Sequence, residues 1–194
     1  KMHEEGLSLG RSGKQVIWGL TPTGALLATD PNSENFKVDF YEVGRVKPVT
    51  IEHSLDVQAV RITALKNGWT EWQSSRKVHR MAQEDRATWL QVPDAIAKSP
   101  EGFQVAFEVE RTIKTPKRYD AILSNFAQMM QDGTIQKVFY ISPEKICPRI
   151  ERLFRSIKKI TLYDGNEKRV MATPEGLFKR FTFITYEQWG KQEW

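Results

Sequence analysis

The residues best suited to chemistry are three carboxylates and one lysine near the middle of the chain. Glu108 and Glu110 lie two residues apart, Lys114 follows Glu110 by four residues, and Asp94 precedes them. Carboxylate oxygens are the ligands that hard cations such as Mg²⁺ prefer. A nearby lysine can steady an attacking water or the charge on a phosphate. These residue types in this spacing predict metal-dependent cleavage of a phosphodiester.

Two strands and a turn must bring these residues together. The sequence Ser-Pro-Glu-Gly at 99–102 is a turn signal between two apolar runs. Apolar and polar residues alternate over 103–110, which is the period of a strand. The hairpin would place Asp94 near Glu108, and Glu108 and Glu110 share one face because side chains repeat every second residue.

A helix is predicted to follow this hairpin, from Pro116 to about Gln131. Its inner stripe has Tyr119, Ile122, Leu123, Phe126 and Met130. Four cations crowd its entrance: Arg111, Lys114, Lys117 and Arg118. Cations beside carboxylates suit a site that holds both a metal ion and DNA.

The acidic residues resemble a variant of the PD-(D/E)XK nuclease core of restriction endonucleases. That core ends in Glu-x-Lys, whereas here Glu110 occupies the lysine position and the lysine is displaced to Lys114 or Lys117. The resemblance implies an α/β fold, with a mixed central sheet flanked by helices, as in restriction endonucleases. The order of the predicted helices and strands is compatible with this sheet.

The run at 107–119, together with His53 upstream, also resembles the replication-relaxation family, which includes the MOBC-type relaxases of mobilisable plasmids. The resemblance implies metal-dependent, site- and strand-specific nicking at an origin of transfer. It implies Mg²⁺ or Mn²⁺ as cofactor and double-stranded and single-stranded DNA as partners. A coupling protein or an accessory mobilisation protein would be a further partner.

The resemblance also assigns roles to individual residues. The implied metal ligands are Asp94, Glu108 and Glu71, and the catalytic set adds Glu110 and Lys114. The implied DNA-binding residues are His53, Arg11, Lys14, Arg111, Lys117 and Arg118. A covalent protein–DNA link would need a tyrosine, and Tyr119 is near, although its place on the apolar stripe favours core packing.

Three alternatives remain open from the residues alone. The carboxylates could form ion pairs with Arg111, Lys114 and Lys117 in a non-catalytic DNA-binding module, such as a replication initiator or accessory factor. The protein could be a transcriptional regulator whose C-terminal domain only dimerises. His53 could cap or pack its helix, and Glu52 could face the site in its place.

The sequence predicts three segments: residues 1–30 as the remnant of a winged-helix DNA-binding domain, 31–48 as a linker with a short strand at 38–43, and 49–194 as the nuclease domain. In the first segment a hairpin precedes Thr21, a plausible N-cap, and Pro22. An ordinary surface hairpin is the alternative to a wing. Because the chain begins at Lys1, we expect further residues to precede it.

The composition is typical of a globular protein, and its positive charge favours binding to a polyanion. The 194 residues include 6 Trp and 10 Phe, and the net charge is +5. The lone Cys147 excludes an internal disulfide, and we expect a cytoplasmic protein. No apolar run approaches the roughly 20 residues that a membrane-spanning helix needs.

The remaining elements follow from periodicity and turn residues. A helix is expected at 50–67, with Leu55, Ala59, Ile62 and Leu65 as its buried stripe. Residues 76–86 read as a charged loop, and strands are expected at 69–74, 136–142, 160–163 and 181–185. A helix at 143–159 would carry a basic flank, either a DNA footprint or a solvated face: Lys145, Arg149, Arg152, Arg155 and Lys159.

Overall fold

The computed structural model describes residues 2–8, 14–28, 48–85 and 89–191. The chain divides into two compact units, residues 1–55 and residues 56–194. Within the described ranges, none of the helices has the length and apolar character that crossing a bilayer requires.

The first unit contains a hairpin followed by a short helix. Strands β1 (Met2–Ser8) and β2 (Lys14–Leu20) pair antiparallel, and α1 (Pro22–Ala28) follows. The backbone N–H of Gly24 donates to Thr21 Oγ1 at 3.0 Å, which confirms Thr21 as the N-cap. Arg11, the side chain of Lys14 and residues 31–47 of the predicted linker lie outside what the structure describes.

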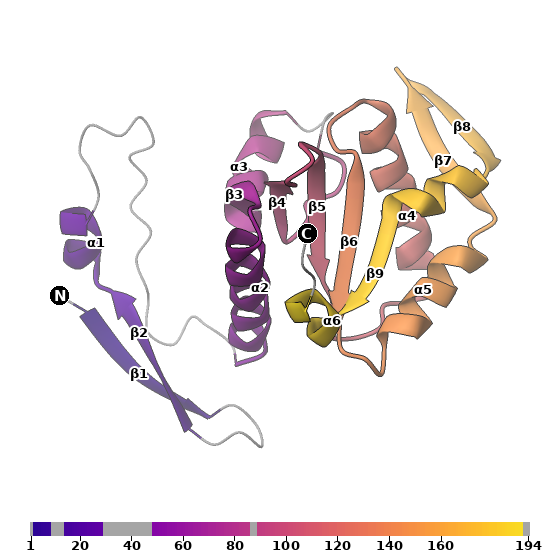
Figure 1. Cartoon of the computed structure of the whole chain (residues 1–194). Coiled ribbons are helices and arrows are strands. Elements are labelled where there is room, and N and C mark those ends of the chain that lie inside the picture. The colour runs from indigo at the N-terminus through magenta and orange to yellow at the C-terminus, as the bar shows by residue number, and fades with distance from the viewer. Residues whose placement is uncertain (1, 9–13, 29–47, 86–88, 192–194) are drawn as a thin grey trace. The chain divides into compact units, whose positions relative to one another are not determined.

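The second unit is built on a five-stranded mixed sheet in the order β3-β4-β5-β6-β9 (Figure 1). The first three strands form an antiparallel meander, and β6 and β9 then continue the sheet parallel to β5. The bounds are β3 (Thr70–Ser74), β4 (Ala95–Lys98), β5 (Gln104–Val109), β6 (Lys137–Ser142) and β9 (Phe181–Thr185). The predicted mixed sheet is therefore confirmed.

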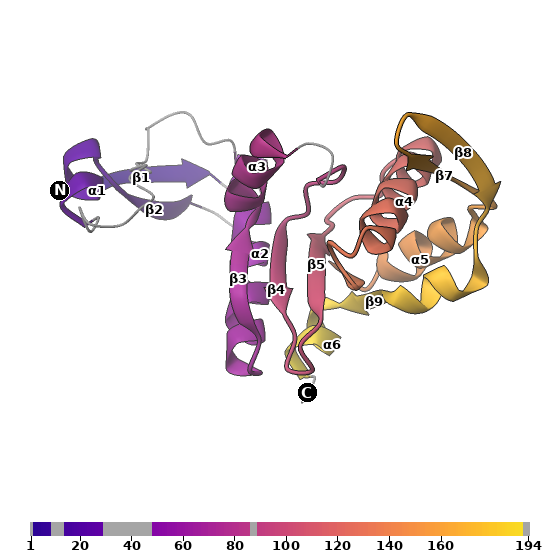
Figure 2. The ribbon, with the colours of Figure 1, turned by 90° about the horizontal axis from the view of Figure 1, so that it is seen from above.

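Helices cover both faces of this sheet (Figures 1 and 2). On one face, the part of α2 (Pro48–Lys66) that belongs to this unit and α6 (Tyr186–Lys191) pack on an aromatic layer that includes Trp69, Phe107 and Trp189. On the other face lie α3 (Ser75–Glu84), α4 (Pro116–Gln131) and α5 (Cys147–Ser156). The ends of β4 and β5 that carry the acidic residues lie between these layers.

A second hairpin is attached to α4. It consists of β7 (Lys159–Asp164) and β8 (Glu167–Ala172), followed by the 3₁₀ segment η2 (Glu175–Arg180). The backbone N–H groups of Thr161 and Tyr163 donate to Ser124 Oγ at 3.0 Å and to Gln128 Oε1 at 2.7 Å. Polar side chains of α4 thus satisfy the edge of β7 that β8 does not pair.

Several predictions about individual elements are wrong. The predicted charged loop at 76–86 contains α3, which begins at Ser75 and buries Val78. The helix predicted at 143–159 is shorter, because Lys159 already begins β7. Strand β8 and helix α6 were not predicted.

The buried stripe predicted for α2 is also wrong. Leu55, Ile62 and Leu65 are exposed, whereas Val60 and Ala64 are buried. Helix α2 carries apolar residues on more than one face, so periodicity alone does not choose between them. Val60 and Ala64 belong to the same buried cluster as the large rings of Trp69, Phe107 and Trp189, so small side chains of α2 pack with large aromatic ones.

Candidate active site

Asp94 and Glu108 lie on the same face of the sheet. The β4–β5 register pairs Ala95 with Phe107 and Ile96 with Ala106, so the next pair outward is Asp94 with Glu108. Side chains of directly opposed residues have Cβ atoms about 5 Å apart. The backbone N–H of Val109 donates to Asp94 Oδ2 at 2.8 Å, which holds the aspartate against the end of β5. The predicted juxtaposition of these two carboxylates is therefore present.

Lys114 belongs to the same group. It lies between β5 and α4 and forms an ion pair with the buried carboxylate of Glu110. Burial lowers the pKa of Lys114, and the negative charges of Glu108 and Asp94 oppose this shift. The lysine therefore experiences the electric field of both carboxylates.

Two tyrosines form the buried floor of this group. Tyr140 pairs with Glu108 in the β5–β6 register, so both side chains share the face covered by α4. Its hydroxyl is buried and has no hydrogen-bond partner among the described residues. Burial, followed by the charge of Glu108, raises the Tyr140 pKa well above its usual range. An unpaired buried hydroxyl costs desolvation free energy that no hydrogen bond offsets.

Tyr119 is held in the core. Its hydroxyl accepts a hydrogen bond from the backbone N–H of Lys114 at 3.1 Å, and its ring packs against Phe154 with a centroid distance of 5.2 Å. Burial raises the Tyr119 pKa, which disfavours the ionised form that a nucleophile requires. The structure therefore favours the packing role of Tyr119.

Gln91 is a site residue that the sequence reasoning missed. Its Nε2 donates to Glu108 Oε1 at 3.0 Å, so it orients the buried carboxylate from the segment before β4. Periodicity gives no signal here, because Gln91 lies in an irregular segment. Its position three residues before Asp94 was the one feature of the sequence that could have indicated a role in the site.

Glu71 does not join the acidic group. Thr70 pairs with Lys98, so Glu71 lies at the end of β4 that is remote from Asp94, about four residues or 13 Å along the strand. Its side chain is 60% exposed and forms an ion pair with Lys98 at 3.4 Å. The backbone of Glu71 has a φ of 53° and the register shifts beside it, which breaks the strand alternation used in the prediction.

Arg111 faces the opposite side of the sheet from the acidic group. Its guanidinium pairs with Asp56 of α2 at 2.5 Å, and the hydroxyl of Tyr186 donates to the same carboxylate at 3.1 Å. Burial and the charge of Asp56 raise the Tyr186 pKa. Arg111 therefore links the segment after β5 to α2 and, through Asp56, to Tyr186 of α6. Its predicted contact with DNA stays a prediction.

The remaining basic residues occupy different places. Lys117 and Arg118 are exposed in the first turn of α4, and the charge of Arg118 contributes to the lowered pKa of Lys114. His53 and Glu52 lie on α2 within the first unit. The structure thus brings Arg118 close to Lys114 of the acidic group. The predicted DNA-binding roles of Lys117 and His53, and the alternative role of Glu52, stay predictions.

The donor set is compatible with a hard divalent cation. In the described part of the chain no cluster combines three or more His, Cys, Asp or Glu side chains suited to a metal. Mg²⁺ commonly uses only one or two protein carboxylates and keeps several waters. Asp94 and Glu108 meet that requirement.

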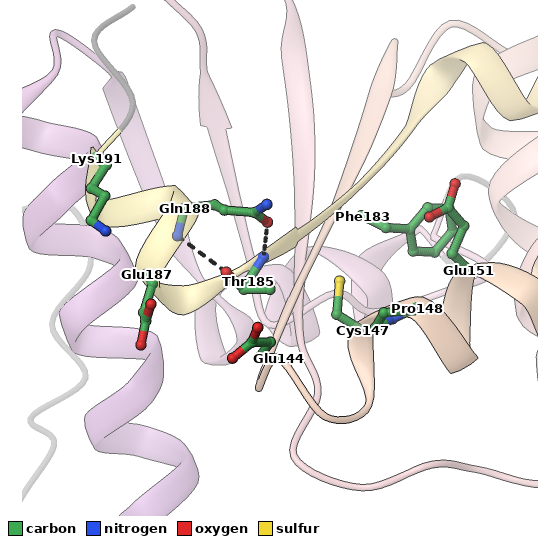
Figure 3. Close-up of a pocket in the computed structure, with 9 residues that line it drawn as sticks. All are labelled: Glu144, Cys147, Pro148, Glu151, Phe183, Thr185, Glu187, Gln188 and Lys191. Carbon is green, nitrogen blue, oxygen red and sulfur yellow. Dashed lines mark hydrogen bonds between the residues drawn. The ribbon is translucent and has the colours of Figure 1, made fainter.

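A separate cleft of about 450 Å³ lies where β9 meets α6 and α5 (Figure 3). Thr185 and Gln188 cap α6 reciprocally: Gln188 N–H donates to Thr185 Oγ1 at 3.1 Å, and Thr185 N–H donates to Gln188 Oε1 at 2.9 Å. Burial raises the pKa of Cys147, which argues against a nucleophilic thiolate. Three glutamates, Glu144, Glu151 and Glu187, outnumber the one lysine of the lining, Lys191, which disfavours a phosphate.

Comparison with known proteins adds no assignment. No family model, no curated protein and no solved structure matches this chain.

Proposed function

We propose that this protein is a metal-dependent, strand-specific DNA nickase, a relaxase acting at a plasmid origin of transfer. The observation that carries the proposal is the placement of Asp94 and Glu108 on one face of adjacent strands with Lys114 in their field. The acidic residues lie beside exposed cations at the start of α4, which suits a site for a phosphate backbone.

The topology also supports the finer fold proposal. The order along the chain is α2, β3, α3, β4, β5, α4 and β6. Strands β3, β4 and β5 pair antiparallel, and α4 is the crossover to β6, which is parallel to β5. We propose that this is a restriction-endonuclease-like core of the PD-(D/E)XK type. The β1–β2 hairpin and α1 agree with a partial winged-helix domain before it.

Each residue then has a defined role in the proposed reaction. Bound Mg²⁺ or Mn²⁺ would neutralise charge on the scissile phosphate, with Asp94 and Glu108 as its protein ligands. Gln91 and the Val109 amide orient these two carboxylates. Glu110 holds Lys114, which steadies the attacking water or the developing negative charge on the phosphate.

The proposed partners follow from this activity. Double-stranded origin DNA is the substrate, single-stranded DNA is released from it, and a coupling or accessory mobilisation protein would receive the complex. The proposed location is the cytoplasm. Lys117 and Arg118 are the described residues best placed to contact the backbone near the site.

The proposal is tested with supercoiled plasmid that carries the origin region of the replicon encoding the protein. With Mg²⁺ or Mn²⁺, we expect conversion to the relaxed form, and we expect Asp94→Asn and Glu108→Gln to reduce its rate by at least about 10²-fold. Lys114→Ala should reduce the rate more than DNA binding, because its role is in the transition state. Glu71→Gln is the matched control and should leave the rate unchanged.

A second candidate function is a non-catalytic DNA-binding replication initiator or accessory factor. The ion pair between Lys114 and Glu110 favours it, because it satisfies two of the groups that catalysis would use. This function would be supported if the wild-type protein bound the origin but did not nick it with either Mg²⁺ or Mn²⁺. Nicking that is lost in both carboxylate variants would exclude it.

A further inference from the structure

A polar cleft of about 380 Å³ lies between α4 and the β7–β8 hairpin, and the proposed nickase reaction gives it no role. Its walls are formed by Ser124 and Asn125 of α4, by Lys159, Thr161 and Tyr163 of β7, and by Lys168 of β8. Ser124 lies six residues beyond Arg118 on the same helix, which corresponds to a rise of about 9 Å. The cleft is thus reached from the candidate active site along one helix.

The hairpin carries an aromatic ring and two cations on one face. Lys159 and Tyr163 are four residues apart on β7 and therefore share a face, and Tyr163 pairs with Lys168 across the strands. The Tyr163 side chain is 49% exposed. In the described part of the chain, neither lysine forms an ion pair with a carboxylate.

The wall that carries this ring is held rigidly. The backbone N–H groups of Thr161 and Tyr163 are bonded to side chains of α4, and Ile160 is buried in the core beneath the hairpin. Tyr163 is therefore displayed at a fixed place beside α4. A preorganised aromatic platform binds at a lower entropic cost than a mobile one.

We infer that this cleft binds a segment of single-stranded DNA, with a base stacked on Tyr163 and phosphates neutralised by Lys159 and Lys168. A positively charged groove with an exposed aromatic ring is the recurrent solution for binding single strands. A duplex hides the faces of its bases, whereas an open strand offers them for stacking. The two lysines outweigh the one carboxylate of the lining, Asp120.

This inference rests on the proposed function for the choice of DNA as the polymer. It adds a path for the strand: from the acidic group, past Arg118 and along α4, to the hairpin. Holding the strand there would keep the nicked end near Asp94 and Glu108. No contact to base edges is required, so the cleft increases the affinity for single-stranded DNA without adding sequence specificity.

The test is the affinity of the full chain for a fluorescent oligothymidine of about 20 nucleotides, measured by anisotropy without divalent metal. We expect Tyr163→Ala, and separately Lys159→Ala with Lys168→Ala, to weaken binding at least about fivefold. Tyr163→Phe keeps the ring and should bind like the wild type. Lys66→Ala, an exposed lysine at the end of α2, is the matched control for loss of charge and should have no effect.

The outcomes separate this inference from the nickase proposal. Binding that depends on Tyr163 in a protein that nicks no DNA supports the cleft and overturns the nickase. Nicking together with equal oligothymidine affinity of wild type and Tyr163→Ala overturns the cleft. Absence of oligothymidine binding by the wild type, or an equal loss of duplex affinity in Tyr163→Ala, also overturns it.

Discussion

At the scale of single residues, we expect the hydroxyls of the two buried tyrosines beside the acidic group to have different effects on stability. The Tyr140 hydroxyl lacks a partner among the described residues, whereas the Tyr119 hydroxyl accepts a hydrogen bond from Lys114. We expect Tyr140→Phe to raise the free energy of unfolding, or leave it unchanged, because it removes an unsatisfied buried group. We expect Tyr119→Phe to lower it by about 1 kcal/mol.

Urea unfolding of the two variants and the wild type measures both effects under one condition. Each substitution removes only the hydroxyl oxygen, so each variant controls for the other. A loss of more than about 1 kcal/mol in Tyr140→Phe would contradict the prediction, and would mean that an internal water bonds this hydroxyl to the protein.

The residue scale also shows what sequence alone can predict about the site. Asp94 and Glu108 were placed together correctly, because a hairpin with strict alternation fixes which side chains share a face. Tyr140 was not identified, because its place opposite Glu108 depends on the register of two strands separated by α4. Glu71 was misplaced, because its φ of 53° interrupts the alternation on which the prediction relied.

At the scale of elements, the existence of helices and strands was easier to predict than their faces. The meander, α4 and β6 follow from clear periodicity and turn residues. Helix α2 was predicted with nearly the observed bounds, but its buried face was reversed. Periodicity identifies an apolar face, whereas the shape of the opposing aromatic layer decides which apolar face is buried.

This reversal gives a prediction about α2 itself. Val60 is 1% exposed, whereas Ile62 is 52% exposed although it is the larger side chain. We expect Val60→Ala to lower the free energy of unfolding by about 1–3 kcal/mol, because it removes buried methyl groups and leaves a cavity. We expect Ile62→Ala to change it by less than about 0.5 kcal/mol, since alanine favours helix and little buried surface is lost.

The midpoint of urea unfolding measures both substitutions, and an unchanged slope would show that the unfolded states are comparable. An Ile62→Ala loss as large as that of Val60→Ala would contradict the observed packing. It would mean that the face predicted from the sequence is the one that carries the stability of α2.

At the scale of the whole molecule, the net charge of +5 says little until the charges are placed. Arg111 was counted as a DNA contact from its position among four cations, but its charge is matched by Asp56. Lys117 and Arg118 are exposed in the first turn of α4. If the protein binds DNA as proposed, we expect fewer of these cations to contact it than the sequence suggests, and the salt dependence of the affinity can count them.

Affinity for single-stranded DNA should fall with salt, and each phosphate contact should contribute about 0.7 to the slope of log K against log salt concentration. We expect replacement of both Lys117 and Arg118 by Ala to reduce this slope by about 1.4, because two contacting cations are lost. Arg111→Gln, which retains a donor for Asp56, should leave the slope unchanged, since its charge is already neutralised within the fold. Anisotropy titrations with an oligothymidine over a range of salt concentrations measure these slopes. If Arg111→Gln reduced this slope as much as the Lys117 and Arg118 replacement, Arg111 would contact DNA. Its ion pair with Asp56 would then not be purely structural.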